Sequence, residues 1–192
     1  MTQTIFKSGF VNIIGNPNVG KSTLMNELVG ERLSIITSKA QTTRHRIMGI
    51  LSGDDYQIVY SDTPGILNPK YALQSSMMRS VESALDDADL ILYVKDVVET
   101  MDKNEEFLHR ILDADVPKII VINKIDLSNQ EKLEELVGKW HELAPDSNII
   151  PASAKNKFNR DALLNNILSI LPEGEPYFPK DQIIHRNSNN RK

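Results

Sequence analysis

The chain has 192 residues, of which 40% are hydrophobic and 25% are charged, and its formal net charge is −4. This length suits a single domain with one core, and the negative charge argues against a surface built mainly to bind nucleic-acid phosphates. The chain has no cysteine, which excludes disulfides and thiolate metal sites. Because it has neither a long apolar run nor a signal-peptide pattern, the sequence predicts a soluble, cytoplasmic protein.

The first predicted element is a strand in the apolar run 10–14, which a glycine-rich loop and a helix follow. Residues 15–22 have the spacing G-x-x-x-x-G-K-S. In this pattern main-chain N–H groups surround a polyphosphate, Lys21 reaches its β and γ phosphates, and Ser22 binds Mg²⁺. We therefore predict a nucleoside-triphosphate site rather than a glycine-rich turn without a ligand. The residues expected to contact the nucleotide are Asn16, Pro17, Asn18, Val19, Gly20, Lys21, Ser22 and Thr23.

A helix is predicted over about residues 21–29, with Gly30 at its end. The segment 31–46 is polar, and we expect a long loop there, which in a compact domain usually has a function. The runs 47–51 and 57–60 are β-prone, and the turn residues between them predict an antiparallel hairpin.

The hairpin leads into Asp62-Thr63-Pro64-Gly65. Asp62 can hold Mg²⁺, usually through water, and the main-chain N–H of Gly65 can bond an oxygen of the γ-phosphate. A D-x-x-G pattern is common by chance, so its position after a predicted strand is what gives it weight.

Three apolar runs predict further strands, and amphipathic segments predict helices between them. The strands are expected at 90–94, 119–122 and 148–150, and the helices at about 104–113, 130–143 and 160–171. Such alternation is typical of a parallel sheet with helices on both faces. We predict an α/β protein with the P-loop NTPase fold: a mostly parallel six-stranded sheet with one antiparallel strand and helices on both faces. Ligands bind such sheets at the carboxyl ends of the strands.

Residues 123–126 read Asn-Lys-Ile-Asp and directly follow the strand predicted at 119–122. Guanine offers N1–H and an exocyclic amine, which the carboxylate of Asp126 can accept together, whereas adenine has no donor at N1. Lys124 can lay its alkyl stem over the base, and Asn123 can tie this loop to the glycine loop. The pattern favours GTP over ATP; the alternative is a surface turn that caps the next helix.

Ser153-Ala154-Lys155 follows the last predicted strand. At this place the main-chain N–H of Ala154 can donate to O6 of guanine. The triad alone is weak evidence, but all these segments occur in the order that a nucleotide-binding sheet requires.

Five segments together resemble the motifs of the translation-factor-related small GTPases, and in particular the Era family of bacterial GTPases. They are 15–22, 41–44, 62–65, 123–126 and 153–155, and the strings at 16–23, 39–46 and 172–179 carry the closer resemblance. The resemblance covers about residues 5–182. It implies a site for GTP or GDP with Mg²⁺, in which Thr43 completes the coordination of the ion beside Ser22 and Asp62. It also implies switches at 31–46 and at about 65–86, with Lys21, Thr43 and Gly65 active in hydrolysis.

Two residues of this sequence bear on the rate of hydrolysis. Ile66 stands where many regulatory GTPases carry the glutamine that orients the attacking water, so we predict slow intrinsic turnover. Asn18 matches an asparagine that in relatives helps to coordinate K⁺, and we hypothesise that K⁺ takes the place of an arginine finger. Arg44, His45 and Arg46 are interpreted as a solvated switch surface rather than as catalytic groups.

The resemblance implies partners that this chain is expected to bind poorly. The family acts in maturation of the small ribosomal subunit, binds its rRNA and associates peripherally with membranes; its proteins continue into a KH domain, which clamps single-stranded RNA. We expect residues 1–172 to form the GTP-binding domain and 173–192 a linker or tail towards an absent KH domain. RNA binding should then be weakened or lost, and we expect a monomer.

Two other functions stay open. A module that binds GTP or GDP with negligible turnover is the chief alternative, and Ile66 favours it. An RNA-binding protein in its own right would depend on the local cluster of Lys39, Arg44 and Arg46.

Overall fold

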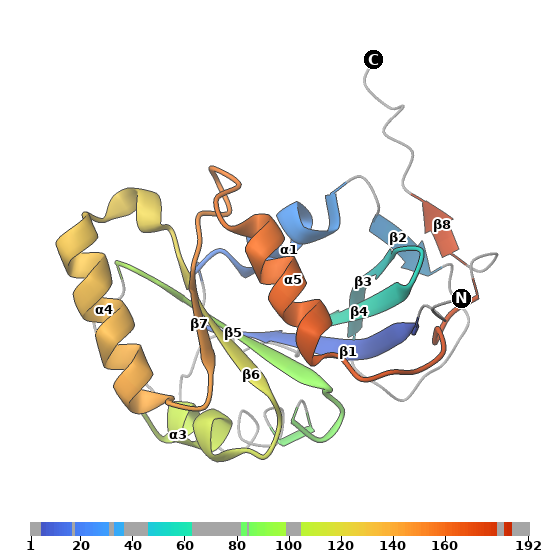
Figure 1. Ribbon diagram of the computed structural model, residues 1–192, viewed down its shortest axis with the longest axis horizontal. Coiled ribbons are helices and arrows are strands. Elements are labelled where there is room, and N and C mark those ends of the chain that lie inside the picture. The colour runs from blue at the N-terminus through green and yellow to red at the C-terminus, as the bar shows by residue number, and fades with distance from the viewer. Residues whose placement is uncertain are drawn as a thin grey trace, which may run out of the picture.

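The computed structural model is shown in Figure 1. It describes residues 5–16, 18–30, 33–36, 46–62, 82–83, 85–98, 105–179 and 183–185. None of the helices in these ranges is long and apolar enough to cross a membrane.

One mixed sheet, in the order β7-β6-β5-β1-β4-β3-β2-β8, runs through the molecule (Figure 1). Strand β1 is central and parallel to β4 and β5, and β6 and β7 continue the parallel part. Strand β3 is antiparallel to β4. These strands form the predicted six-stranded sheet with one antiparallel member, which confirms the P-loop fold. The strands are β1 (Lys7–Ile14), β2 (Leu33–Ile36), β3 (Arg46–Ser52), β4 (Tyr56–Asp62), β5 (Leu90–Asp96), β6 (Lys118–Asn123), β7 (Asn148–Pro151) and β8 (Ile183–His185).

Two short strands, β2 and β8, extend this sheet beyond the prediction. β2 pairs antiparallel with β3, and β8 pairs antiparallel with β2, with Ile35 opposite Ile184. The sequence predicts a long loop over 31–46, which is wrong for the residues of β2. β8 lies in the segment that the sequence interprets as a linker or tail. Each strand is a short apolar stretch in a polar segment, which gains main-chain partners only by joining a sheet edge.

Helices cover both faces of the sheet, because alternate residues of its buried strands point to opposite sides. On one face Val11, Leu92 and Val121 pack with residues of α1 and α5. On the other face Tyr93 and Ile120 pack with residues of α3 and α4. The helices with bounds in the part of the chain that the structure describes are α1 (Lys21–Val29), α3 (Glu105–Asp113), α4 (Gln130–Leu143) and α5 (Arg160–Ile170), and η2 (Ile125–Leu127) is a 3-10 turn.

After α5 the chain returns along β1 and β4, and we call residues 173–179 the C-terminal strap. The N–H of Gly174 donates to the carbonyl of Phe6 at 3.0 Å. The hydroxyl of Ser8 donates to the carbonyl of Glu175 at 2.7 Å. These bonds attach this part of the chain to the sheet, and the expected boundary at residue 172 with a linker or tail after it stays a prediction.

Aromatic packing accompanies these bonds. Phe178 contacts a small buried cluster of Phe10, Ile50 and Val59. The ring of Tyr177 meets that of Phe10 edge-on, with 4.6 Å between centroids. The strap thus covers apolar surface of the sheet, which explains why the Pro-rich composition of 172–179 does not leave it free.

Candidate functional site

The glycine-rich loop joins the carboxyl end of β1 to α1, and its two glycines are required by close contacts. A Cβ on Gly15 would lie 2.2 Å from the carbonyl oxygen of Val94, and a Cβ on Gly20 would lie 2.3 Å from Nδ2 of Asn123. Gly20 also has a φ of +96°, which L side chains rarely adopt. The loop can therefore take this shape only with glycine at both ends.

Lys21 starts α1, and its ammonium lies against the main chain of the loop. Its Nζ donates to the carbonyls of Gly15 at 2.8 Å and Asn16 at 2.7 Å. The residue that caps α1 is Gly20, which offers no side chain to the first N–H groups of the helix. A lysine beside such a helix start is a setting that favours an anion. Ser22 and Thr23 are exposed on the same turn.

Asn123, at the end of β6, connects two loops through a buried amide. Its Nδ2 donates to the carbonyl of Val19 at 2.9 Å, and its Oδ1 accepts from the N–H of Ala154 at 3.1 Å. The sequence assigns that N–H to O6 of guanine; here it is bonded to Asn123 instead. The geometry therefore joins the glycine loop, the 123–126 segment and the 153–155 segment into one unit.

Asp126 lies in η2 with an exposed side chain. Its Oδ1 accepts the hydroxyl of Ser153 at 2.6 Å, and the oxygen of that hydroxyl accepts from the N–H of Asn156 at 3.2 Å. The carboxylate is thus oriented from the third segment. The alternative that this turn caps the next helix is wrong, because Asn129 caps α4 by accepting from the N–H of Lys132.

Lys124 has a left-handed backbone, with φ +61°, and its ammonium bridges two elements. It donates to the carbonyl of Asn18 at 2.5 Å and to Oδ2 of Asp96 at 2.6 Å. The sequence did not point to Asp96, which is the last residue of β5. An acidic residue at the carboxyl end of a buried strand, next to the strand that precedes 123–126, was the available signal.

The remaining predicted residues are placed only in part. Asp62 ends β4, where its main chain is in register with Ile13 of β1, so it lies at the same edge of the sheet as the glycine loop. Lys155 follows Ala154 and is exposed. Predictions for Pro17, Thr43, Gly65 and Ile66 fall outside the described residues.

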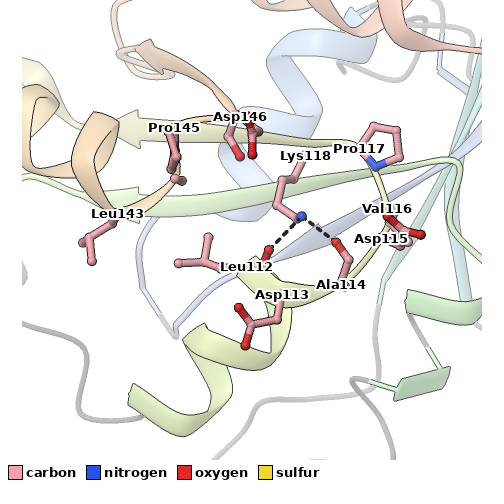
Figure 2. Close-up of a pocket in the computed structure, with 12 residues that line it drawn as sticks. Leu112, Asp113, Ala114, Asp115, Val116, Pro117, Lys118, Leu143, Pro145 and Asp146 are labelled. Carbon is pink, nitrogen blue, oxygen red and sulfur yellow. Dashed lines mark hydrogen bonds between the residues drawn. The ribbon is translucent and has the colours of Figure 1, made fainter.

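A separate pocket of about 500 Å³ lies at the opposite edge of the sheet, between the loops after α3 and α4. Figure 2 shows the ammonium of Lys118 in it, donating to the carbonyls of Leu112 at 3.0 Å and Ala114 at 2.7 Å. Burial lowers the pKa of Lys118, and nearby aspartate carboxylates oppose that shift. None of the predicted site residues lines this pocket.

The chain is similar to known proteins in sequence and in fold. The model of the 50S ribosome-binding GTPases matches residues 10–124. GTPase Era of Alkaliphilus metalliredigens is 44% identical over 179 residues, which are 93% of this chain and 61% of that protein. GTPase Era of Clostridium perfringens is 44% identical over 183 residues, with the same coverage.

Solved structures give the same result. A crystal structure of Era in complex with MgGDPNP and a 16S ribosomal RNA fragment has a TM-score of 0.75 at 42% identity, covering 93% of this chain and 61% of that one. Aquifex aeolicus Era bound to GDP and AlF₄⁻, as a Tyr→Ala variant, has a TM-score of 0.73 at 41% identity and covers 93% and 62%. The chain spans about three fifths of the length of these relatives.

The family match extends over more than half of the chain, from β1 through the glycine loop to Lys124. Of the two loops that Asn123 joins, the glycine loop lies within the matched region, and Ala154 lies after it. The sheet order is that of the predicted P-loop fold. We conclude that this chain belongs to the family of 50S ribosome-binding GTPases, in which it is an Era-like GTP-binding domain.

Proposed function

We propose that this chain is a Mg²⁺-dependent switch that binds and slowly hydrolyses GTP. The observation that carries the proposal is the double hydrogen bond of Asn123 to Val19 and Ala154. It fixes the loop that would hold the phosphates relative to the loops that would hold the base. Such preorganisation lets one ligand contact both ends of the site without ordering it first.

Guanine is the base that this arrangement fits. Ser153 holds one oxygen of the Asp126 carboxylate, so that the group faces the ligand in one orientation. A carboxylate accepts both donors of guanine but would meet no donor at N1 of adenine. The stem of Lys124, fixed at its ammonium, supplies one apolar wall.

Mg²⁺ fits the same edge of the sheet. The ion usually takes only one or two protein oxygens and completes its shell with phosphate and water. The exposed hydroxyl of Ser22 at the start of α1 and the position of Asp62 at the end of β4 match that small donor set. Thr43 would add a third oxygen. When bound, the ion would neutralise charge on the phosphates.

Hydrolysis by this chain would depend on positioning and charge. The ammonium of Lys21 and the main-chain N–H groups of the glycine loop would stabilise the transferring phosphoryl group, together with the N–H of Gly65. Ile66 cannot orient water, which makes intrinsic turnover slow. K⁺ near the exposed side chain of Asn18 would supply further positive charge.

The wider role that we propose is in maturation of the small ribosomal subunit. One of the similar Era structures is a complex with a 16S ribosomal RNA fragment. Because this chain matches about three fifths of those proteins, we assign the nucleotide switch to residues 1–172. Binding of rRNA, peripheral membrane contact, a monomeric state and a cytoplasmic location are further parts of the proposal.

A binding module with negligible turnover is the second candidate, because Ile66 leaves water without a side chain to orient it. Phosphate release under multiple turnover distinguishes the two functions. We expect release from GTP but not from ATP, dependence on Mg²⁺, and faster release in K⁺ than in Na⁺ at equal ionic strength. GTP binding without release would favour the second candidate, and equal rates in the two salts would contradict the K⁺ hypothesis.

Lys21→Ala should lower turnover roughly 100-fold, because it removes a charged donor to the phosphates. Lys118→Ala is a matched control: Lys118 is also a lysine that donates to two main-chain carbonyls, but it lies at the opposite edge of the sheet. Its turnover should equal that of the unchanged protein. Equal losses in both variants would contradict the role of Lys21.

A further inference from the structure

An ion pair joins the ends of β5 and β6 beside the predicted base site. Oδ2 of Asp96 lies 2.6 Å from Nζ of Lys124. The carboxylate is 9% exposed and the lysine side chain 32%, so this pair is much more shielded from solvent than an ordinary surface pair. The pair therefore fixes the far end of the Lys124 side chain.

The second carboxylate oxygen of Asp96 bonds to the main chain. Oδ1 accepts from the N–H of Val98 at 3.1 Å, which orients the carboxylate and closes the turn after β5. The ammonium of Lys124 in turn reaches the carbonyl of Asn18 in the glycine loop. Asp96 is thus connected to the glycine loop through Lys124.

We propose that Asp96 is a positioning residue for guanine-nucleotide binding, an inference that rests on the proposed function. Its carboxylate holds the Lys124 ammonium against the glycine loop, so that the four-carbon stem is stretched across the site before a base arrives. A free lysine side chain loses much rotational freedom when it is immobilised. Because Asp96 immobilises the Lys124 side chain when the protein folds, this rotational freedom is lost on folding and not on binding. The nucleotide then binds to a stem that is already ordered.

This role predicts a specific kinetic pattern. The stem contacts the base equally in the ground state and the transition state, because bond cleavage takes place at the other end of the nucleotide. Loss of its positioning should therefore raise KM and the rate of nucleotide dissociation, with kcat unchanged.

Asp96→Asn is the sharpest test, because asparagine has the same shape and keeps an oxygen for the N–H of Val98 while it removes the charge. We expect a fluorescent GDP to dissociate roughly tenfold faster, as for loss of a charge-assisted hydrogen bond. KM for GTP should rise by a similar factor and kcat should stay within about twofold. Asp96→Glu, which keeps the charge, should restore part of the lost affinity.

A double-mutant cycle with Lys124→Met separates positioning from general destabilisation. Methionine keeps an apolar stem and cannot pair with Asp96, so the double variant should dissociate GDP no faster than Lys124→Met alone. Asp89→Asn is the matched control: Asp89 precedes β5 at its other end and also accepts a main-chain N–H, that of Phe10 at 2.7 Å. It should leave GDP dissociation unchanged.

Three results would overturn the inference: normal GDP dissociation in Asp96→Asn, additive effects in the cycle, or an equal effect of Asp89→Asn. If Asp96→Asn did not fold, the rates of GDP dissociation from Lys124→Met and Asp96→Glu would test the inference instead, since both variants keep the Val98 contact available. The inference requires faster dissociation from Lys124→Met than from Asp96→Glu. Failure of the unchanged protein to bind GDP at all would instead refute the proposed function.

Discussion

Two side-chain amides in distant parts of the molecule make the same pair of bonds. Asn123 donates to the carbonyl of Val19 and accepts from the N–H of Ala154. Gln57, on β4, donates to the carbonyl of Phe178 at 3.0 Å and accepts from its N–H, also at 3.0 Å. Both amides are buried to the same degree, with 2% of each residue exposed.

The two amides differ in what they hold. Asn123 joins two different loops at the carboxyl ends of the strands, where α/β sheets bind ligands. Gln57 makes both bonds with one residue, Phe178 of the C-terminal strap, which lies over the cluster of Phe10, Ile50 and Val59. The same hydrogen-bond chemistry therefore builds a ligand site in one place and only tertiary structure in the other, and the surroundings decide which.

Replacing Asn123 should have the largest effect. Asn123→Ala leaves the Val19 carbonyl and the Ala154 N–H without their partner, each at a cost of about 1–3 kcal/mol, and it releases the two loops from each other. We expect GDP affinity to fall roughly 100-fold, which is about 2.7 kcal/mol. Calorimetric titration with GDP measures the affinity, and urea unfolding measures the stability. A loss of stability with normal GDP affinity would show that Asn123, like Gln57, stabilises only the tertiary structure.

Replacing Gln57 should reduce stability alone. Gln57→Ala removes both bonds to Phe178 and should lower the free energy of unfolding by about 2 kcal/mol. GDP affinity should not change, because the strap is bonded to β1 and β4 away from the glycine loop. The two measurements used for Asn123→Ala apply here, and a large loss of GDP affinity would remove the distinction between the two amides.

Replacing Asn129 should have the smallest effect on the free energy of unfolding. It provides a reference value for the losses expected on replacing Asn123 and Gln57. Its side chain accepts from the N–H of Lys132, three residues away, and caps α4. Asn129→Ala should cost about 1 kcal/mol, the usual value for an N-cap. Urea unfolding measures this loss, and GDP affinity should stay constant. A cost equal to that of Gln57→Ala would mean that the strap bonds contribute no more than a local cap.

Continuous apolar runs and fixed motif spacing made most of the molecule predictable from sequence. The runs at 90–94 and 119–122 are buried strands, and the residues of 15–22 and 123–126 come together as their spacing implied. Two of the misses were Gln57 and Asp96, since each is a single polar residue whose partner is distant in sequence, by 121 residues for Phe178 and 28 for Lys124. No local pattern contains that information.

Two further differences between the prediction and the structure have other causes. The N–H of Ala154 was expected to face the base, but the amide of Asn123 competes for it. β2 and β8 were missed because strands of four and three residues carry too little periodicity to be recognised.

The pairing of β8 with β2 has a consequence for the solubility of shortened versions of this chain. In the part of the chain that the structure describes, β8 occupies the outer edge of β2. A version cut after residue 179 would leave that row of N–H and C=O groups on β2 without the partners that β8 supplies. Bare strand edges recruit one another, so such a version should self-associate and precipitate at concentrations that the intact chain tolerates.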